Sequence, residues 1–143
     1  RYDAVASVEM AEAVGEDYWP AYLQSIARLL KPGGRAALQL ISIREPLFEA
    51  YKSSADFIQT YIFPGGMLVS EARFRAIAEA AGLEWRDRQG YALHYAETLR
   101  RWRERYNRAV AEGRLPGFEG EFHDLWLYYL MYCEGGFRGG EAR

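Results

Sequence analysis

The side chains that usually hold metal ions or form disulfides are scarce in this sequence, which has one cysteine and two histidines among 143 residues. The single cysteine, Cys133, excludes a disulfide within the chain and a cysteine-based zinc site, and it is consistent with a reducing compartment. His94 and His123 alone are too few for an ordinary zinc site. We therefore expect no metal site.

An excess of charge of one sign and long apolar runs are also missing. Lys and Arg number 18 against 20 Asp and Glu, a formal net charge of -2, so no basic field attracts the chain to nucleic acid. No segment approaches the roughly 18 uninterrupted apolar residues of a membrane-spanning helix. With 50% hydrophobic and 15% aromatic residues, the composition favours one globular, cytoplasmic domain without nucleic-acid partners.

The first 43 residues predict a strand, a helix and a second strand. The segment "YDAVASVE" (2–9) is short, rich in Val and Ala, and typical of a buried parallel strand. Residues 19–30 have apolar side chains at helical spacing, and "KPGG" (31–34) is expected to end this helix. The strand "RAALQLISI" (35–43) follows directly. Short links between these three elements indicate a crossover unit in a parallel sheet.

Downstream of this crossover the pattern becomes more helical. An irregular, aromatic-rich insertion begins at Pro46, and Ser70 is the expected N-cap of a helix over 71–81. The segment "LEWRDRQG" (83–90) alternates as a third strand would. Two more helices are predicted, over 95–112 and from 122 to about 133. Three strands are too few for a self-contained open sheet, so we expect a segment of a larger domain, cut at both ends.

Ligands of open α/β sheets bind beyond the carboxyl ends of the strands, so polar residues that follow each predicted strand are candidate site residues. These are Glu9 and Glu12 after the first strand, Gln39 to Ser42 in the second, and Tyr91, His94 and Tyr95 after the third. Each has a structural alternative, because a carboxylate after a strand is often a helix cap or a solvated charge. Gln39 lies between apolar neighbours, so we expect a buried amide, either in a site or as a satisfied core glutamine.

Two further segments suggest an apolar or lipid-facing surface. In "YIFPGG" the glycines permit a close turn beside Tyr61, Ile62 and Phe63, and the alternative is a turn capped by core aromatics. The helix "LRRWRERYNRAV" carries five arginines near the aromatic "DLWLYYLMYC", and arginines beside such a surface could bind lipid phosphates. The alternative is a solvated arginine face over an aromatic core, in which Cys133 is a small core hydrophobe.

Five segments carry a family resemblance, in order, over almost the whole chain: "SVEMAEAVG", "LLKPGGRAALQLISI", "YIFPGGMLVS", "HYAETLRRWRERY" and "YYLMYCEGGFR". Together they resemble the cyclopropane-fatty-acyl-phospholipid synthase family, which includes the mycolic acid cyclopropane synthases. The resemblance implies an α/β fold, the C-terminal part of a Rossmann-like sheet of an S-adenosylmethionine (SAM)-dependent methyltransferase, with helical insertions that line an acyl-chain channel. Residues 1–143 would then be a partial domain without its N-terminal SAM-binding half and its last strand.

The same resemblance implies roles for individual residues. By position, Glu12 corresponds to the family's active-site glutamate, Tyr95 to its bicarbonate-binding tyrosine, and Ile41 to a backbone contact at the end of the second strand. Gln39 stands where many members have a histidine; it can donate a hydrogen bond to an anion but cannot act as a base. Val8 falls beside the SAM pocket. Four more residues fall where members line the acyl channel: Phe63, Leu99, Cys133 and Phe137.

The implied activity is transfer of a methylene group from SAM to the cis double bond of an unsaturated phospholipid acyl chain, which forms a cyclopropane fatty acid. The alkene attacks the sulfonium methyl, and bicarbonate, which Glu12 and Tyr95 would hold, then removes a methyl proton so that the ring closes. The expected cofactors are SAM and bicarbonate, the expected location is peripheral to the inner face of the membrane, and a homodimer is compatible with it. Two alternatives stay open: a SAM-dependent methyltransferase that makes methyl-branched lipids or modifies another lipophilic acceptor, and a non-catalytic lipid-binding remnant.

Overall fold

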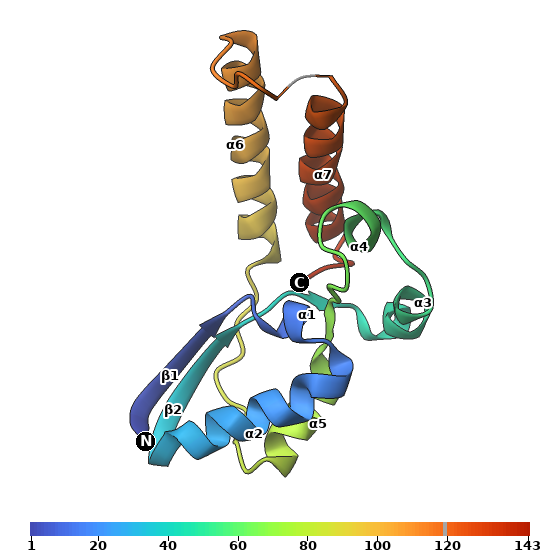
Figure 1. The fold of residues 1–143 in the computed structure, drawn as a ribbon. Coiled ribbons are helices and arrows are strands. Elements are labelled where there is room, and N and C mark those ends of the chain that lie inside the picture. Colours follow the sequence, from blue (N-terminus) through green and yellow to red (C-terminus); the bar gives the residue numbers. More distant parts are fainter. Residues whose placement is uncertain (119) are drawn as a thin grey trace. The chain divides into compact units, whose positions relative to one another are not determined.

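The computed structural model describes residues 1–118 and 120–143 and divides the chain into two compact units, Arg1–Gln89 and Gly90–Arg143 (Figure 1). The first unit contains strands β1 to β4 and the shorter helices. Its elements in chain order are β1 (Tyr2–Val8), α1 (Ala11–Val14), the 3-10 turn η1 (Glu16–Tyr18), α2 (Trp19–Leu29), β2 (Leu30–Gln39), β3 (Ser42–Ile43), the 3-10 turn η2 (Glu45–Leu47), α3 (Phe48–Lys52), α4 (Phe57–Tyr61), β4 (Val69–Ser70) and α5 (Glu71–Ala80).

The predicted strand, helix and strand at the start of the chain are confirmed. β1 and β2 lie side by side in parallel, with α2 as the connection between them (Figure 1). Val8 is the register partner of Gln39, so the two strands end together. One boundary was wrong: "KPGG" lies inside β2 instead of before it. A register shift between Tyr2 and Ala4 takes up the extra residues, and Gly33, with φ of 76°, supplies the left-handed backbone that this irregularity requires.

The second predicted strand is divided. β2 stops at Gln39, and the chain resumes as β3, which pairs in parallel with β4 from beyond the insertion. Ser70 caps α5 as predicted, because its hydroxyl accepts a hydrogen bond from the Arg73 N–H at 3.2 Å. The division places the chain between the two strands, residues 40 and 41, beside α1.

Aromatic side chains fill the core between α2 and α5. Trp19 and Phe74 are fully buried, with their ring centroids 5.6 Å apart in an edge-to-face arrangement. The indole N–H of Trp19 donates to the Ala11 carbonyl at 3.1 Å, which ties α2 to the short helix α1. Buried polar groups of this kind keep a hydrogen-bond partner, and here the bond also fixes the position of the residue after Ala11, Glu12.

The predicted third strand, over 83–90, is wrong. Residues 83–90 have no regular secondary structure, and Asp87 has a left-handed backbone with φ of 54°, which interrupts an extended chain. Leu83 and Trp85 instead pack on the core, where the Trp85 ring meets Phe74 at 6.4 Å between centroids. The alternating pattern therefore reflected burial of one side of a loop against α5.

The second unit is a pair of helices, α6 (Ala92–Ala111) and α7 (Glu121–Arg138), which lie side by side (Figure 1). α6 begins three residues earlier than predicted, and α7 runs five residues beyond the predicted end at Cys133. Gly135 and Gly136 lie within α7, because glycine weakens a helix by only about 1 kcal/mol and the surrounding contacts outweigh that preference. Among the described residues, no helix combines the length and apolar character needed to cross a bilayer.

Candidate functional site

The carboxyl ends of β1 and β2 bring together four of the predicted site residues. The Glu9 N–H donates to the Gln39 carbonyl at 2.8 Å, and the Gln39 side-chain amide donates to Glu9 Oε1 at 3.0 Å. Glu12, on α1, accepts a short hydrogen bond from the Ile41 N–H through Oε1. The edge that the strand pattern predicted therefore gathers these side chains into one cluster, with two carboxylates, one amide and one backbone donor.

Glu12 is the least ordinary carboxyl group of this cluster. Its side chain is half-buried, and its second oxygen, Oε2, is buried without a hydrogen-bond partner among the described residues. Burial raises the pKa of the carboxyl; the Ile41 and Glu12 N–H groups partly offset this rise, and the charge of Glu9 adds to it. A raised pKa and a buried oxygen with no partner are typical of groups that exchange protons in functional sites.

The "YIFPGG" segment leads to a contact with the same cluster, through the backbone of Glu12. Gly66 N–H donates to the Phe63 carbonyl at 2.9 Å and so closes a turn, after which the Met67 N–H donates to the Glu12 carbonyl at 2.9 Å. Tyr61 and Phe63 are 66% and 57% exposed, so the alternative in which these rings cap the turn from within the core is wrong. The insertion holds the backbone of Glu12 and presents aromatic side chains at its surface.

Two predicted residues on the strands differ in their surroundings. Gln39 is exposed, although we expected a buried amide. Its neighbours Leu38 and Leu40 pack on the core, so alternation along the strand places Gln39 on the opposite face. Val8, at the end of β1, is 65% exposed and presents apolar surface at the edge where ligands of open sheets bind.

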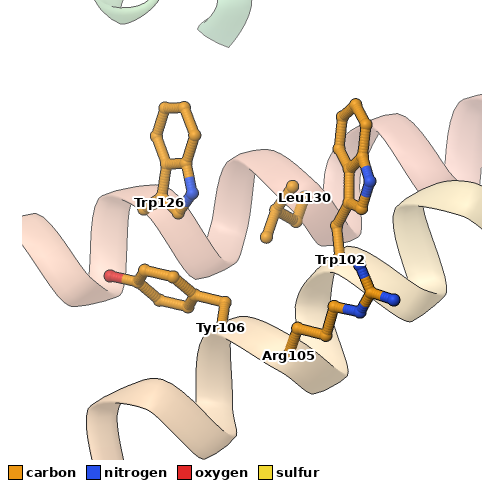
Figure 2. Close-up of a pocket in the computed structure, with 5 residues that line it drawn as sticks. All are labelled: Trp102, Arg105, Tyr106, Trp126 and Leu130. Atoms are coloured by element: carbon orange, nitrogen blue, oxygen red, sulfur yellow. The ribbon is translucent and has the colours of Figure 1, made fainter. Parts of the chain in front are cut away.

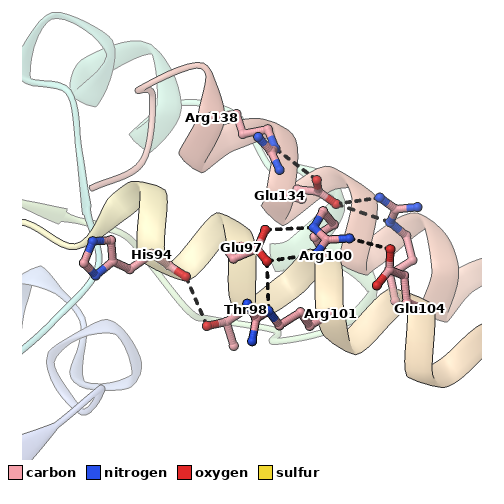
Figure 3. Close-up of polar contacts among 9 residues, drawn as sticks. His94, Glu97, Thr98, Arg100, Arg101, Glu104, Glu134 and Arg138 are labelled. Atoms are coloured by element: carbon pink, nitrogen blue, oxygen red, sulfur yellow. Dashed lines mark hydrogen bonds and ion pairs between the residues drawn. The ribbon is translucent and has the colours of Figure 1, made fainter.

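The remaining predicted residues belong to the second unit. Leu99 and Phe137 are buried, and the Tyr95 ring packs edge-on against Phe137 at 4.8 Å between centroids. Cys133 is half-buried and free of any disulfide. Of the other polar candidates, His94 lies in the first turns of α6, where its carbonyl accepts from the Thr98 hydroxyl at 3.1 Å (Figure 3).

A groove of about 290 Å³ lies on the second unit. Figure 2 shows an indole at either end, Trp102 from α6 and Trp126 from α7, with Leu130 between them and Arg105 and Tyr106 along α6. The sequence did not single out these residues one by one. The signal was the combination of an arginine-rich helix with an aromatic one, which favours amphipathic surfaces where aromatic rings and cations meet.

Most of the α6 arginines are neutralised by glutamates. Hydrogen bonds from Arg100 and Arg101 lower the pKa of Glu97 to about 2 (Figure 3). Arg103 and Arg138 both bind Glu134, at 2.9 Å and 3.0 Å. Two arginines of α6 make no ion pair within the described part of the chain: Arg105 and Arg108. The charge that remains on this helix therefore lies at and beyond the groove.

Among the residues that the structure describes, no group of His, Cys, Asp and Glu side chains is placed to hold a metal ion. The cluster at the ends of β1 and β2 offers two carboxylates, the Gln39 amide and the Ile41 N–H. Such a set can place negative charge beside a developing cation and can accept a proton.

Comparison with known proteins gives one consistent family. The model of the mycolic acid cyclopropane synthetase family matches residues 1–143. The chain is 42% identical over 141 residues to tuberculostearic acid methyltransferase UfaA1 of Mycobacterium tuberculosis, covering 98% of this chain and 33% of that protein. It is 31% identical over 145 residues to cyclopropane-fatty-acyl-phospholipid synthase of Escherichia coli K12, covering 100% of this chain and 36% of that protein.

A solved structure agrees with these relatives. Mycolic acid cyclopropane synthase CmaA1, complexed with SAH and CTAB, matches with a TM-score of 0.84 and 27% identity, over 98% of this chain and 52% of that one. The α/β fold predicted from the sequence, part of a methyltransferase fold, is confirmed by this match. The chain spans about a third of the length of the curated relatives it matches.

Proposed function

The chain belongs to the mycolic acid cyclopropane synthetase family, and on that basis we propose that the full-length protein is a SAM-dependent enzyme that alkylates the cis double bond of an unsaturated acyl lipid. The observation that carries the proposal is Glu12: a half-buried carboxyl with a raised pKa, at the shared end of two parallel strands. The same α/β edge is where ligands bind in open sheets.

SAM, when bound, supplies an electrophilic methyl group on a sulfonium sulfur. In our proposal Val8 lines part of the SAM pocket, since its side chain gives exposed apolar surface at the end of β1. CmaA1 was solved with SAH, which supports SAM as the methyl donor for a member of this family. Residues outside this chain's length would supply the rest of the pocket in our proposal.

The residues of the chain then act on the acyl group. Attack by the alkene leaves positive charge on the acyl chain, and in our proposal the Glu12 carboxylate supplies the fixed negative charge that stabilises it. Exposed Phe63, on the turn that precedes Met67, offers an aromatic face to the same charge. The roles that the resemblance implies in the second unit, an acyl channel lined by Leu99, Cys133 and Phe137 and a bicarbonate contact from Tyr95, stay predictions; Leu99 and Phe137 are buried within that unit.

Two products are compatible with this chemistry. Proton loss with ring closure adds one methylene and gives a cyclopropane, as the name of the Escherichia coli relative states for that enzyme. A methyl branch is favoured by a second observation, since the relative at 42% identity is named a methyltransferase. We take alkylation of the double bond as the proposed reaction, with a cyclopropane or a methyl branch as its product.

The groove on the second unit supports contact with the surface of a bilayer. Tryptophan and tyrosine rings favour the membrane interface, and Arg105 lies on the Trp102 side of the groove without an ion pair among the described residues. Guanidinium groups bind phosphate oxygens with two parallel hydrogen bonds. We propose that this groove meets phospholipid headgroups at the inner face of the membrane.

The test uses the full-length protein, SAM with a labelled methyl group, and vesicles of a phospholipid with oleoyl chains. Mass spectrometry of the recovered lipid should show the added carbon, and NMR should distinguish a ring from a branch. A protein that binds SAM but leaves the lipid unchanged would contradict the proposal. A protein that binds vesicles but not SAM would favour the lipid-binding alternative.

A further inference from the structure

Residues 67–69, which follow the glycine turn, connect to both the backbone and the side chain of Glu12. The Met67 N–H donates to the Glu12 carbonyl at 2.9 Å, and the Val69 N–H donates to the Ile41 carbonyl at 3.1 Å. The N–H of the same Ile41 donates to Glu12 Oε1. The position of the Glu12 carboxyl therefore depends on where the segment 67–69 lies.

A tyrosine side chain holds the middle of this segment. Because the N–H groups of Met67 and Val69 are bound to backbone carbonyls, the N–H between them, on Leu68, needs an acceptor of its own. It donates to the Tyr51 hydroxyl at 3.0 Å. Burial raises the pKa of Tyr51, so the group that accepts this hydrogen bond is the neutral hydroxyl.

Tyr51 has a defined position because its helix is attached to the core. It lies on α3 and packs against the buried core of the first unit. On the same helix, Phe48 is buried with its ring centroid 6.5 Å from that of Trp19, and Lys52 forms an ion pair with Glu16. A hydrogen-bonding group on such an anchored helix can fix the position of a neighbouring segment.

The chain directly before the segment 67–69 is less constrained by its own backbone. Gly65 and Gly66 precede the segment, Gly65 with φ of 83°, and glycine can adopt many backbone conformations. The Gln59 side-chain amide donates to the Gly66 carbonyl at 3.1 Å, which attaches the turn to α4. The Tyr51 hydroxyl is the contact at the centre of the segment, between its two bonds to the site.

We propose that Tyr51 is a positioning residue for Glu12: its hydroxyl, through the Leu68 N–H, holds the segment that orients the Glu12 carboxyl. The inference rests on the proposed function. Tyr51 does not touch the substrate here and acts only through the backbone. A small displacement of an oriented group reduces the rate of a reaction that depends on it, so loss of the hydroxyl should reduce turnover more than binding.

The first test is Tyr51→Phe in the full-length protein, which keeps the ring in the core and removes only the hydroxyl. We expect kcat for methyl transfer to fall about ten-fold, with the KM values for SAM and phospholipid within about two-fold of those of the unmodified protein. A variant with normal kcat would overturn the inference.

Tyr22→Phe is the matched control for a loss of stability alone. Tyr22 is also half-buried, and its hydroxyl donates to the Ser7 hydroxyl at 2.7 Å instead of contacting the segment 67–69. Both variants lose one hydrogen bond, so their melting temperatures should fall by similar amounts. The kcat of Tyr22→Phe should stay unchanged, and an equal fall of kcat in both variants would overturn the inference.

A double-mutant cycle shows whether Tyr51 acts through Glu12. In Glu12→Gln the oriented charge is already absent, so adding Tyr51→Phe should lower the remaining single-turnover rate by less than about two-fold. A fall of about ten-fold in both backgrounds would overturn the inference, because Tyr51 would then act independently of Glu12.

Backbone hydrogen exchange, followed by mass spectrometry, gives a readout that does not depend on activity. Peptides that contain residues 67–69 should exchange about ten-fold faster in Tyr51→Phe than in the unmodified protein or in Tyr22→Phe. Equal exchange in all three proteins would overturn the inference. A protein that transfers no methyl group would contradict the proposed function, while the exchange rates still show whether Tyr51 holds the segment at Glu12.

Discussion

Glu12 in the first unit and Glu134 in the second are two shielded glutamates with opposite surroundings. Glu134 is 9% exposed, and its two oxygens bind the guanidinium groups of Arg103 and Arg138 (Figure 3). Burial alone would raise the pKa of Glu134, but these two arginines hold it below the usual range. Glu12 has no such partner among the described residues, so burial prevails and its pKa is raised.

The difference separates a structural carboxylate from a chemical one. A glutamate whose two oxygens both bind cationic side chains stays ionised. It also stabilises the packing of the helices that carry those cations, here α6 and α7. A glutamate with one oxygen fixed and one buried without a partner is costly to keep ionised and is suited to proton exchange. Substitutions at the two positions should therefore affect different properties of the protein.

The largest expected effect is on turnover, in Glu12→Gln. The glutamine oxygen can still accept from the Ile41 N–H, but it cannot hold a proton or a negative charge, so we expect turnover to fall by about 100-fold or more. The melting temperature at neutral pH should stay the same or rise, because a desolvated charge is removed. Turnover and thermal unfolding of the full-length protein are the measurements.

Glu79→Gln is the control for this comparison, because Glu79 forms an exposed pair with Arg75 on α5 and should change neither property. A Glu12→Gln protein with normal turnover and a clearly lower melting temperature would show that Glu12 is structural.

The second prediction concerns stability, in Glu134→Ala. Loss of the carboxylate leaves two guanidinium groups without their shared partner, and we expect the free energy of unfolding to fall by about 1–3 kcal/mol. Denaturant unfolding of the full-length protein measures it. Glu104→Ala, which removes an exposed partner of Arg100 on the same helix, should have a smaller effect; equal losses would refute the distinction.

The third prediction is the pH dependence of these effects. The raised pKa of Glu12 gives a contribution to stability that is present below its usual value of 4.5 and is lost as pH rises. The lowered pKa of Glu134 gives one that is present above that value and lost as pH falls. Between about pH 4 and 7, Glu12→Gln should therefore gain stability relative to the unmodified protein, and Glu134→Gln should lose it.

Unfolding free energies measured across this range would test both signs at once. Parallel pH curves for the two variants would contradict the assigned surroundings.

The smallest expected effect is on membrane binding, in Arg105→Gln. Each arginine near an anionic surface contributes about 1 kcal/mol, so vesicle affinity should fall about five-fold at low salt, and less at high salt. Arg101→Gln is the matched control, because Arg101 is exposed but bound to Glu97. If both variants lose the same vesicle affinity in a sedimentation assay, the groove is not part of the membrane-binding surface.

Local sequence patterns correctly predicted the helices whose formation depends on residues close together in the sequence. The apolar spacing of α2 and the Ser70 hydroxyl at the start of α5 are local features, and both were read correctly. The segment 83–90 was misread because alternation indicates one buried side and does not say whether a second strand is available to pair. The exposure of Gln39 was missed because two apolar neighbours on a strand face away from it.

The sequence by itself determined the family, the order of β1, α2 and β2, and the presence of carboxylates after the first strand, because these follow from residue types and their spacing along the chain. Only the tertiary structure decided which carboxylate is neutralised. Glu12 meets Ile41 across 29 positions, and Glu134 meets Arg103 across 31. Contacts over such separations depend on how the elements pack, and they set burial and charge, on which the chemistry of each carboxyl depends.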